Sequence, residues 1–402
     1  MSDTSKKDQL YELIRANPFI SQQDLAAELG LSRSAVAGHI AGLIRERRLL
    51  GRAYVLPGQR PLLCIGAANL DRKLRTVAPL QMGTSNPANA EEVFGGVARN
   101  IAENLARLKL PTALLTVLGH DAAGRALQQH AEAAGIDTRG SMLLTDAISG
   151  TYTAVLDHAG ELVVALADMA IYERIDPAFL ASRLPQRAGA ALTVADLNLP
   201  RESIAALLAD AARGITNNGA NNGPSNGAGD GAPLVIVAVS QPKMARLPAR
   251  LHGLRLLILN RGELEARAGR ALPGRADLAA ACRALQADGA RDVIVTCGSE
   301  GVYYTDGGEL AWLAALDVDV VDVTGAGDAF AAAVCWSLYH SADQGKADLA
   351  QACRCGLRLS ALTLACRSTV VPALDAGLFD DLVPDAGASG ASASLPAATH
   401  LT

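Results

Sequence analysis

Residues 320–330, with the sequence Val-Val-Asp-Val-Thr-Gly-Ala-Gly-Asp-Ala-Phe, say most about the fold of this chain. The β-branched run at 318–323 predicts a strand, the glycines predict a turn, and the apolar residues 329–339 predict a helix. A turn between a strand and a helix start presents unpaired backbone N–H groups at the positive end of the helix dipole. The stretch therefore predicts an anion-binding site, formed by the amides of Gly325, Ala326 and Gly327.

Asp328 stands at the same turn. Anion binding does not explain a carboxylate there, because it would repel a phosphate. The carboxylate is useful if it takes a proton from a hydroxyl group that then attacks the phosphate. The alternative is a glycine-rich turn in which Asp328 caps the helix, and the further motifs below favour the chemical interpretation.

Composition excludes several classes of protein. Half of the 402 residues are hydrophobic but only 3% are aromatic, which favours α/β layers over a β-sandwich. A net charge of −5 argues against bulk coating of nucleic acid and against a polybasic membrane mode. The seven cysteines contain no C-x-x-C pair. Together with short apolar stretches and a polar start of the chain, this predicts a cytoplasmic protein with no membrane partner.

From residue 61 to 378, strand-like runs alternate with helical ones, which predicts a doubly wound, mostly parallel sheet covered by helices on both faces. The hairpin pattern at 151–165 predicts a small β lid. The Gly/Asn-rich stretch 214–232 and the tail 385–402 predict disorder. Strands are expected at 62–66, 112–118, 151–156, 192–195, 234–239, 256–259, 293–296 and 318–323, and helices at 97–108, 123–134, 201–212, 277–288, 329–340 and 347–365.

Residues 1–57 predict a small separate domain of three helices and a short hairpin. This order resembles the winged helix-turn-helix heads of bacterial regulators, and the resemblance implies that the third helix reads DNA. The alternative is a dimerisation or docking unit that touches no DNA. The resemblance implies base contacts from Ser32, Arg33, Ser34 and His39, and phosphate contacts from Arg47, Arg48 and Arg52.

Polar side chains follow several predicted strands, where α/β sheets bind ligands. Asn69 and Asp71 follow the first strand and suit polyol hydroxyls. Gly95 and Gly96 open a helix and permit close approach of a ligand, and Asn100 lies one turn inside it. Asn260 and Glu263 follow a later strand and could organise waters on Mg²⁺. Thr296, Gly298 and Gly301 end another strand and suit the phosphates of a nucleotide.

These motifs, in this order, resemble the ribokinase-like (PfkB-type) carbohydrate kinases. The resemblance implies ATP and Mg²⁺ as cofactors, Asp328 as the base, and the amides of 325–327 as the anion hole. It implies a nucleotide site at Asn260, Thr296, Gly298, Gly301 and Thr324, with Glu263 acting on Mg²⁺ through water. Asp322 matches a position that binds a monovalent cation, such as K⁺, in many members. Substrate contacts are implied at Asn69, Asp71, Gly95, Gly96, Arg99, Asn100 and Tyr152.

Within that family the runs Thr84–Pro87 and Gly95–Leu105 look most like those of pseudouridine kinases. Arg99 stands where ribokinases and fructokinases usually have a small residue. The run Val237–Ser240 departs from that branch, and so does the N-terminal head. Kinases of another nucleoside or of a simple sugar such as ribose or fructose therefore stay as alternatives. A catalytically silent, ligand-sensing regulator is the non-enzyme alternative. Related kinases often dimerise through the lid hairpin, so the resemblance also implies a homodimer.

Overall fold

The computed structural model describes residues 5–16, 20, 22–46, 48–49, 60–213, 232–306, 308–341, 348–375 and 377–382. Four expectations fall wholly or mostly outside these ranges. They concern the wing of the head, the insertion at 214–232, the tail at 385–402, and the phosphate contacts of Arg47 and Arg52.

The described part of the N-terminal region consists of three helices around a small apolar core. Leu10, Leu25, Val36 and Leu43 are fully buried in it. The Ser32 hydroxyl accepts a hydrogen bond from the backbone N–H of Ala35 at 3.1 Å and so caps the third helix. The helices are α1 (Lys6–Ala16), α2 (Gln22–Leu29) and α3 (Arg33–Arg45).

The main domain is built on a nine-stranded sheet in the order β15-β14-β13-β12-β11-β10-β1-β4-β6. The strands from β6 to β13 in this order pair in parallel, and β14 and β15 add an antiparallel edge. Four strands are buried at every residue, as a sheet covered on both faces requires. Its strands are β1 (Leu62–Ile65), β4 (Thr112–Leu115), β6 (Ile136–Asp137), β10 (Leu192–Asp196), β11 (Leu234–Val237), β12 (Leu254–Asn260), β13 (Asp292–Thr296), β14 (Val302–Asp306) and β15 (Glu309–Leu313).

Helices cover both faces of this sheet, and a separate apolar core fills each side. One core holds α4 (Val97–Arg107), α5 (Ala122–Ala133), α11 (Ala326–Ser341) and α12 (Leu349–Leu364). The other holds α6 (Pro177–Ser182), α8 (Arg201–Arg213), α9 (Arg261–Ala268) and α10 (Arg275–Ala287). The short helix α7 (Leu184–Gly189), three 3₁₀ turns and a small parallel pair, β5 (Val117–Gly119) with β7 (Met142–Leu144), complete the domain. The predicted α/β architecture is confirmed.

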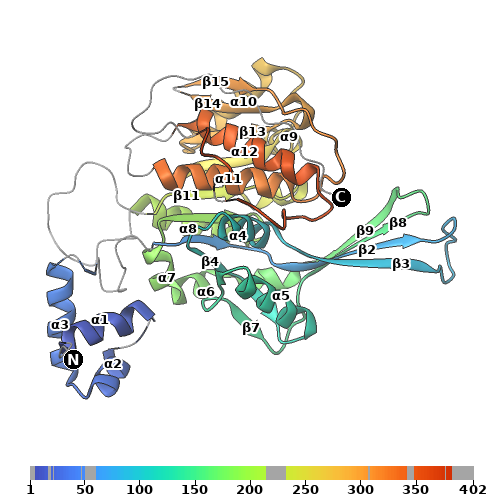
Figure 1. The fold of residues 1–402 in the computed structure, drawn as a ribbon. Helices are drawn as coiled ribbons and strands as arrows, with labels where there is room; N and C mark the ends of the chain where they lie inside the picture. Colours follow the sequence, from blue (N-terminus) through green and yellow to red (C-terminus); the bar gives the residue numbers. More distant parts are fainter. Residues whose placement is uncertain are drawn as a thin grey trace.

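The lid is a four-stranded sheet in the order β3-β2-β8-β9, which projects from the body as a long arm (Figure 1). The expected hairpin corresponds to β8 (Thr151–Leu156) and β9 (Leu162–Asp168). Two further strands, β2 (Asn69–Thr76) and β3 (Ala88–Gly95), were not predicted. Both carry charged residues at several positions, and β3 buries only Gly95, so they lack the apolar alternation that marks a strand.

The prediction of a strand at 318–323 is wrong. This segment has no strand, and Val320, Val321 and Val323 are more than half exposed. The N–H of Val321 donates to the carbonyl of Leu364, at the end of α12, at 2.7 Å. The β-branched run therefore crosses the surface as an extended segment, because the alternating aspartates keep it out of the buried sheet. Helix α11 begins at Ala326, three residues before the predicted start.

A buried carboxylate holds the loops at the carboxyl end of the sheet. Asp196, the last residue of β10, is 1% exposed. Its Oδ2 accepts from the N–H groups of Ala67 at 2.9 Å and Ala98 at 3.0 Å, and its Oδ1 accepts from Asn198 at 2.8 Å. A Cβ on Gly66 would lie 2.3 Å from this carboxylate, so only glycine fits there. Asp196 therefore fixes both the β1–β2 connection and the start of α4.

We expect Asp196→Ala to lower the free energy of unfolding by roughly 3 kcal/mol or more, because it leaves three N–H donors buried without an acceptor. Asp176→Ala is the matched control, because the exposed Asp176 side chain caps α6 with one hydrogen bond, to Phe179. That substitution should cost about 1 kcal/mol. Urea denaturation measures both, and equal losses would contradict the anchoring role.

Candidate active site

The predicted ligand-binding residues gather at one edge of the main sheet. Asn260 at the end of β12 is the register partner of Thr296 at the end of β13. Ile65 pairs with Ala195, so β1 and β10 end at the same level. Because the carboxyl ends of parallel strands meet at one edge, the residues after these strands line a common crevice.

The lid strands contribute four of the predicted substrate residues: Asn69, Asp71, Gly95 and Tyr152. The Asn69 side-chain amide donates to Asp71 Oδ1, and Tyr152 of β8 is the register partner of Asp71. Partners in a parallel pair point to the same face of the sheet, so Tyr152 lies beside Asp71. Burial raises the pKa of Asp71 to about 6, although the hydrogen bond from Asn69 and the charge of Arg99 lower it. Among the described residues, the side-chain donor to Asp71 is Asn69 alone, so hydroxyl groups of a ligand can also donate to this carboxylate.

The structure requires glycine at 95 and 96 for a reason other than the close approach of a ligand that the sequence predicts. A Cβ on Gly95 would lie 2.1 Å from Asp71 Oδ2, and one on Gly96 would lie 2.4 Å from the carbonyl oxygen of Ala67. Gly96 also has a φ of 98°, which side chains rarely adopt. These glycines are therefore required by the packing of the protein around Asp71, whether or not a ligand also approaches them.

Asp328 lies in the first turn of α11, where the sequence analysis placed the base. Its Oδ2 accepts a hydrogen bond from Asn100 Nδ2 at 2.6 Å, so the predicted base and a predicted sugar contact meet. Burial raises the pKa of Asp328 to about 7. The hydrogen bond from Asn100 and the charge of Arg99 lower that pKa, whereas the charges of Asp196 and Asp71 raise it. A carboxylate that titrates near neutrality suits a general base.

Arg99 lies behind this pair rather than in the crevice. Its side chain is 1% exposed and donates to the carbonyls of Gly95 at 3.0 Å and Phe94 at 2.6 Å. It also donates to the side-chain oxygens of Glu103 and Asn100. Because Arg99 occupies the oxygen of the Asn100 amide, the amide nitrogen faces Asp328. This geometry favours a positioning role for Arg99 over the direct substrate contact implied by the resemblance.

The predicted anion site is the first turn of α11. Gly325 has a φ of 84°, and a Cβ there would lie 2.1 Å from the carbonyl oxygen of Thr369. Gly327, by contrast, has open space around the position of a Cβ. The fold therefore requires a glycine at 325 but not at 327, where its absence of a side chain leaves room for a ligand. The N–H of Ala326 makes a long hydrogen bond to the carbonyl of Val323 at 3.4 Å. The first N–H groups of a helix have no acceptor within the helix itself.

Asn260 and Glu263 form a reciprocal cap at the start of α9. Asn260 Oδ1 accepts from the N–H of Glu263 at 2.9 Å, and Glu263 Oε2 accepts from the N–H of Asn260 at 2.7 Å. Glu263 is 4% exposed, and burial raises its pKa even though the hydrogen bond from Asn260 lowers it. No ion pair within the described ranges includes Glu263. A buried carboxylate without a cationic partner fits a magnesium ion held through water.

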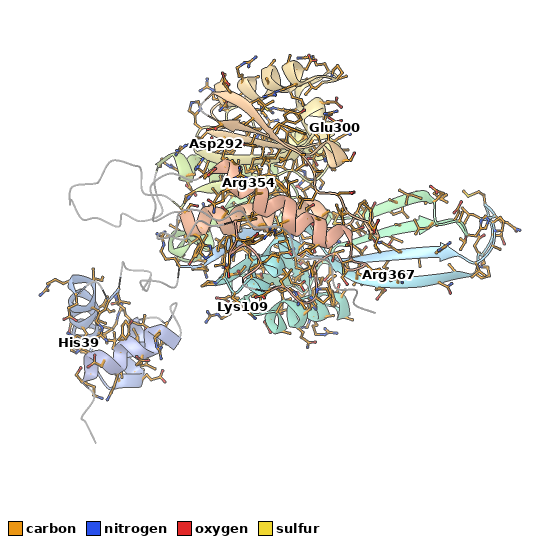
Figure 2. The ribbon with its side chains drawn as sticks, turned by 45° about the horizontal axis from the view of Figure 1, so that its top comes forward. His39, Lys109, Asp292, Glu300, Arg354 and Arg367 are labelled. Carbon is orange, nitrogen blue, oxygen red and sulfur yellow. The ribbon has the colours of Figure 1, made fainter. Side chains whose placement is uncertain are left out.

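Thr296, Gly298 and Gly301 surround a short turn after β13. The N–H of Cys297 donates to the carbonyl of Gly301 at 2.8 Å, which closes the turn. Gly301 has a φ of 101°, and a Cβ there would lie 2.1 Å from the carbonyl oxygen of Leu313. Glu300, labelled in Figure 2, pairs with both terminal nitrogens of Arg261 at 2.9 and 2.5 Å. This ion pair ties the turn to the start of α9, beside Asn260.

Asp322 does not fit the monovalent cation site that the resemblance implies. Its Oδ1 accepts from the backbone N–H of Thr324 at 2.8 Å and from the Thr324 hydroxyl at 2.6 Å. Its Oδ2 accepts from Lys73 Nζ at 2.6 Å. Burial would raise the pKa of Asp322, but the donors from Lys73 and Thr324 hold it below its usual range. The Thr324 hydroxyl is likewise directed at Asp322.

Three residues of the site escaped the sequence analysis. Asp196 directly follows the run 192–195, so the strand-end signal that found Asn260 could have found it. Tyr172 is fully buried and donates through its hydroxyl to the carbonyl of Ala68 at 2.6 Å, but nothing in the sequence marks that contact. Lys73 lies on a strand that was not predicted, and its partner is 249 residues away.

In the N-terminal domain, Ser32, Arg33 and Ser34 are exposed at the start of α3, and His39 is partly exposed one turn further along. Arg48, a predicted phosphate contact, instead donates to Asp8 at 2.9 Å, and its guanidinium lies over the Tyr11 ring at 4.3 Å. Of the predicted DNA contacts that the structure describes, those at the start of α3 are therefore available to a ligand.

Comparison with known proteins agrees with this geometry. Residues 59–376 match the model of the pfkB family carbohydrate kinases, and residues 7–46 match a winged helix-turn-helix DNA-binding model. The chain is 31% identical over 328 residues to the pseudouridine kinase of Escherichia coli (strain K12), an alignment that covers 81% of this chain and 97% of that protein. It is 30% identical over 386 residues to the uncharacterized sugar kinase YeiI of the same strain, with 94% and 99% covered.

Among solved structures, a carbohydrate kinase from Agrobacterium tumefaciens superposes with a TM-score of 0.66 at 28% identity, covering 80% of this chain and 96% of that one. None of the helices in the described ranges has the length and apolar character needed to cross a membrane. The chain therefore belongs to the pfkB family of carbohydrate kinases and is a phosphotransferase that carries an N-terminal winged helix-turn-helix domain.

Proposed function

We propose that this protein transfers the γ-phosphoryl group of ATP, with Mg²⁺, to the 5′-hydroxyl of pseudouridine. The observation that carries the proposal is the hydrogen bond between Asn100 and Asp328. It joins the helix that follows the lid residues to the helix that forms the anion site. An acceptor hydroxyl bound near Asp71 and a phosphate at the turn 325–327 would thus both lie next to one carboxylate.

In the proposed reaction Asp328 accepts the proton of the 5′-hydroxyl as its oxygen bonds to the γ-phosphorus. The bond from that phosphorus to the β–γ bridging oxygen breaks, and ADP leaves. The N–H groups of Gly325, Ala326 and Gly327 stabilise the charge on the phosphoryl group in transit. Mg²⁺, when bound with ATP, supplies positive charge to the phosphates, and Asn260 and Glu263 are the residues that would hold it through water.

Two observations favour pseudouridine as the acceptor over the alternatives. The 31% identical relative from Escherichia coli bears that activity in its name. Arg99, which sets this chain apart from ribokinases and fructokinases, orients the Asn100 amide from inside the protein. Another nucleoside or a simple sugar such as ribose or fructose is the alternative acceptor.

We expect the purified protein with MgATP to show a higher kcat/KM for pseudouridine than for uridine, inosine, ribose or fructose. Coupled detection of ADP measures this. Asp328→Asn should lower turnover by about 10²–10⁴-fold while ATP still binds, because it removes the general base. Asp306→Asn, an exposed substitution on β14, is the control and should leave turnover unchanged. Faster turnover of ribose or fructose would overturn pseudouridine as the proposed acceptor. Full activity of Asp328→Asn would overturn Asp328 as the proposed base.

The pH dependence of kcat/KM should report the protonation of Asp328. A base acts only when deprotonated, so with a pKa of about 7 we expect kcat/KM to fall about tenfold per pH unit below that value and to level off above it. Asn100→Ala removes a hydrogen bond that stabilises the carboxylate, so the inflection should move to higher pH. Asn89→Ala, exposed on the lid, serves as the control. An inflection that stays in place or moves to lower pH in Asn100→Ala would contradict this assignment.

We propose a homodimer formed through the lid. Every residue of the edge strand β9 is exposed, including Leu162, Val164 and Leu166, at 59%, 43% and 61%. An apolar edge strand with unpaired backbone groups needs a partner or it invites aggregation. A second copy of the lid would bury this surface.

We also propose that the N-terminal domain binds DNA, on the evidence of the winged helix-turn-helix match and the exposed start of α3. Ser32, Arg33, Ser34 and His39 are the proposed contacts. A dimer would present two such domains, which suits a site with two half-sites related by two-fold symmetry.

Light scattering at micromolar concentration should give twice the monomer mass, and Leu166→Asp should shift it toward the monomer. Leu184→Asp, at an exposed residue of α7 away from the lid, is the control.

In titrations at a stated salt concentration, the dimer should bind DNA from the protein's own operon more tightly than it binds random duplex. A monomeric wild type would refute the lid interface, and equal affinity for random duplex would refute specific DNA binding.

A further inference from the structure

The lid and the anion site are joined by one ion pair, between Lys73 of β2 and Asp322. Lys73 Nζ lies 2.6 Å from Asp322 Oδ2, and both side chains are largely shielded from solvent, at 31% and 23% exposure. Asp322 stands three residues before Gly325, the first residue of the anion hole. The pair therefore brings a positive charge from the lid to the segment that leads into that turn.

Three protein donors occupy the carboxylate of Asp322, and the lone pair that remains lies on Oδ2, beside Lys73. Oδ1 is taken by the N–H and the hydroxyl of Thr324, and Oδ2 is taken by Lys73. A monovalent cation on Oδ2 would also have to approach the ammonium group, and two like charges at that separation repel each other. The residues present thus do not suit the cation that the family resemblance implies at Asp322.

The direction in which the Lys73 side chain points follows from its position on strand β2. Alternate residues of a strand share a face, so Lys73 lies on the same face of β2 as Asp71. Arg72, between them, points to the other face and pairs with Glu92 on the neighbouring strand at 2.7 Å. Of the two adjacent cations, only Lys73 faces the site, and Arg72 offers a matched control.

We propose that the ammonium group of Lys73 takes the place of a monovalent cation at Asp322, so that phosphoryl transfer by this protein needs no potassium. Lys73 neutralises Asp322 and keeps a negative charge from acting on the phosphate that the adjacent turn binds. Because Lys73 belongs to the lid, this charge is present only when the lid lies over the site. The inference rests on the phosphotransferase activity and not on the identity of the acceptor.

The test compares wild type, Lys73→Met and Arg72→Met in potassium chloride and in tetramethylammonium chloride at equal ionic strength. ADP formation is measured with MgATP and the best acceptor. Wild type and Arg72→Met should be equally active in the two salts, within about twofold. Lys73→Met should be at least about tenfold slower than wild type in tetramethylammonium and should recover severalfold in potassium, because the ion can then occupy the vacated position. Wild type that is activated severalfold by potassium would overturn the proposal.

A second readout does not depend on any acceptor. Potassium should raise the thermal unfolding midpoint of Lys73→Met relative to tetramethylammonium, and should leave the midpoints of wild type and Arg72→Met unchanged. If the wild type phosphorylates none of the acceptors, the proposed acceptor fails while these midpoints still decide the present inference. A potassium-specific rise in wild type would overturn it.

The double variant Lys73→Met/Asp322→Asn covers the case in which potassium rescues neither activity nor stability. If Lys73 acts by neutralising Asp322, removal of both charges should restore much of the activity, or of the unfolding midpoint, that Lys73→Met loses. Lys73→Met that is rescued neither by potassium nor by Asp322→Asn overturns the proposal, and so does Lys73→Met that matches wild type in both salts.

Discussion

The carboxylate of Asp196 is the constraint on which the site depends. It sits at the end of the central strand β10 and accepts hydrogen bonds from the loop after β1 and from the first turn of α4. The first of these segments leads into β2, which carries Asn69 and Asp71, and the second carries Asn100. A buried charge is tolerated there because three backbone N–H groups donate to it. A residue larger than glycine at position 66 would clash with this carboxylate. The geometry of the acceptor site therefore begins with a residue that need not touch the acceptor.

The same arrangement explains why the proposed base titrates near neutrality. The charges of Asp196 and Asp71 both raise the pKa of Asp328, and burial adds the largest contribution. Arg99 is the cation that opposes them, and it acts from behind through Asn100. The three carboxylates outnumber the two cations near them, Arg99 and Lys73, so the site is short of positive charge. A metal ion brought with the nucleotide would relieve that deficit at the moment when phosphates arrive.

Much of the fold could be predicted because its elements are locally encoded. Buried parallel strands appear as continuous apolar runs, and polar residues directly after them, such as Asn260 and Thr296, are brought side by side by the register. The errors have physical causes as well. The run at 318–323 has strong β propensity, yet the sheet offers it no place. Strand β2 carries charged residues and β3 is largely exposed, so both lack the apolar alternation that reveals a strand. The direction of Arg99 depends on Glu103 and on backbone carbonyls that the sequence does not place around it.

The lid combines two tasks that the sequence presents as unrelated. Its β2 strand carries Asp71 and Lys73 on one face, so the proposed substrate contact and the ion pair to Asp322 depend on the same placement of the sheet. Its β9 strand exposes apolar residues that need a partner. Because β2 and β9 are both joined to β8, a partner that rigidifies β9 also restricts β2. Association through the lid would then stabilise the position in which Lys73 reaches Asp322, and assembly and phosphoryl transfer would be coupled through a single sheet.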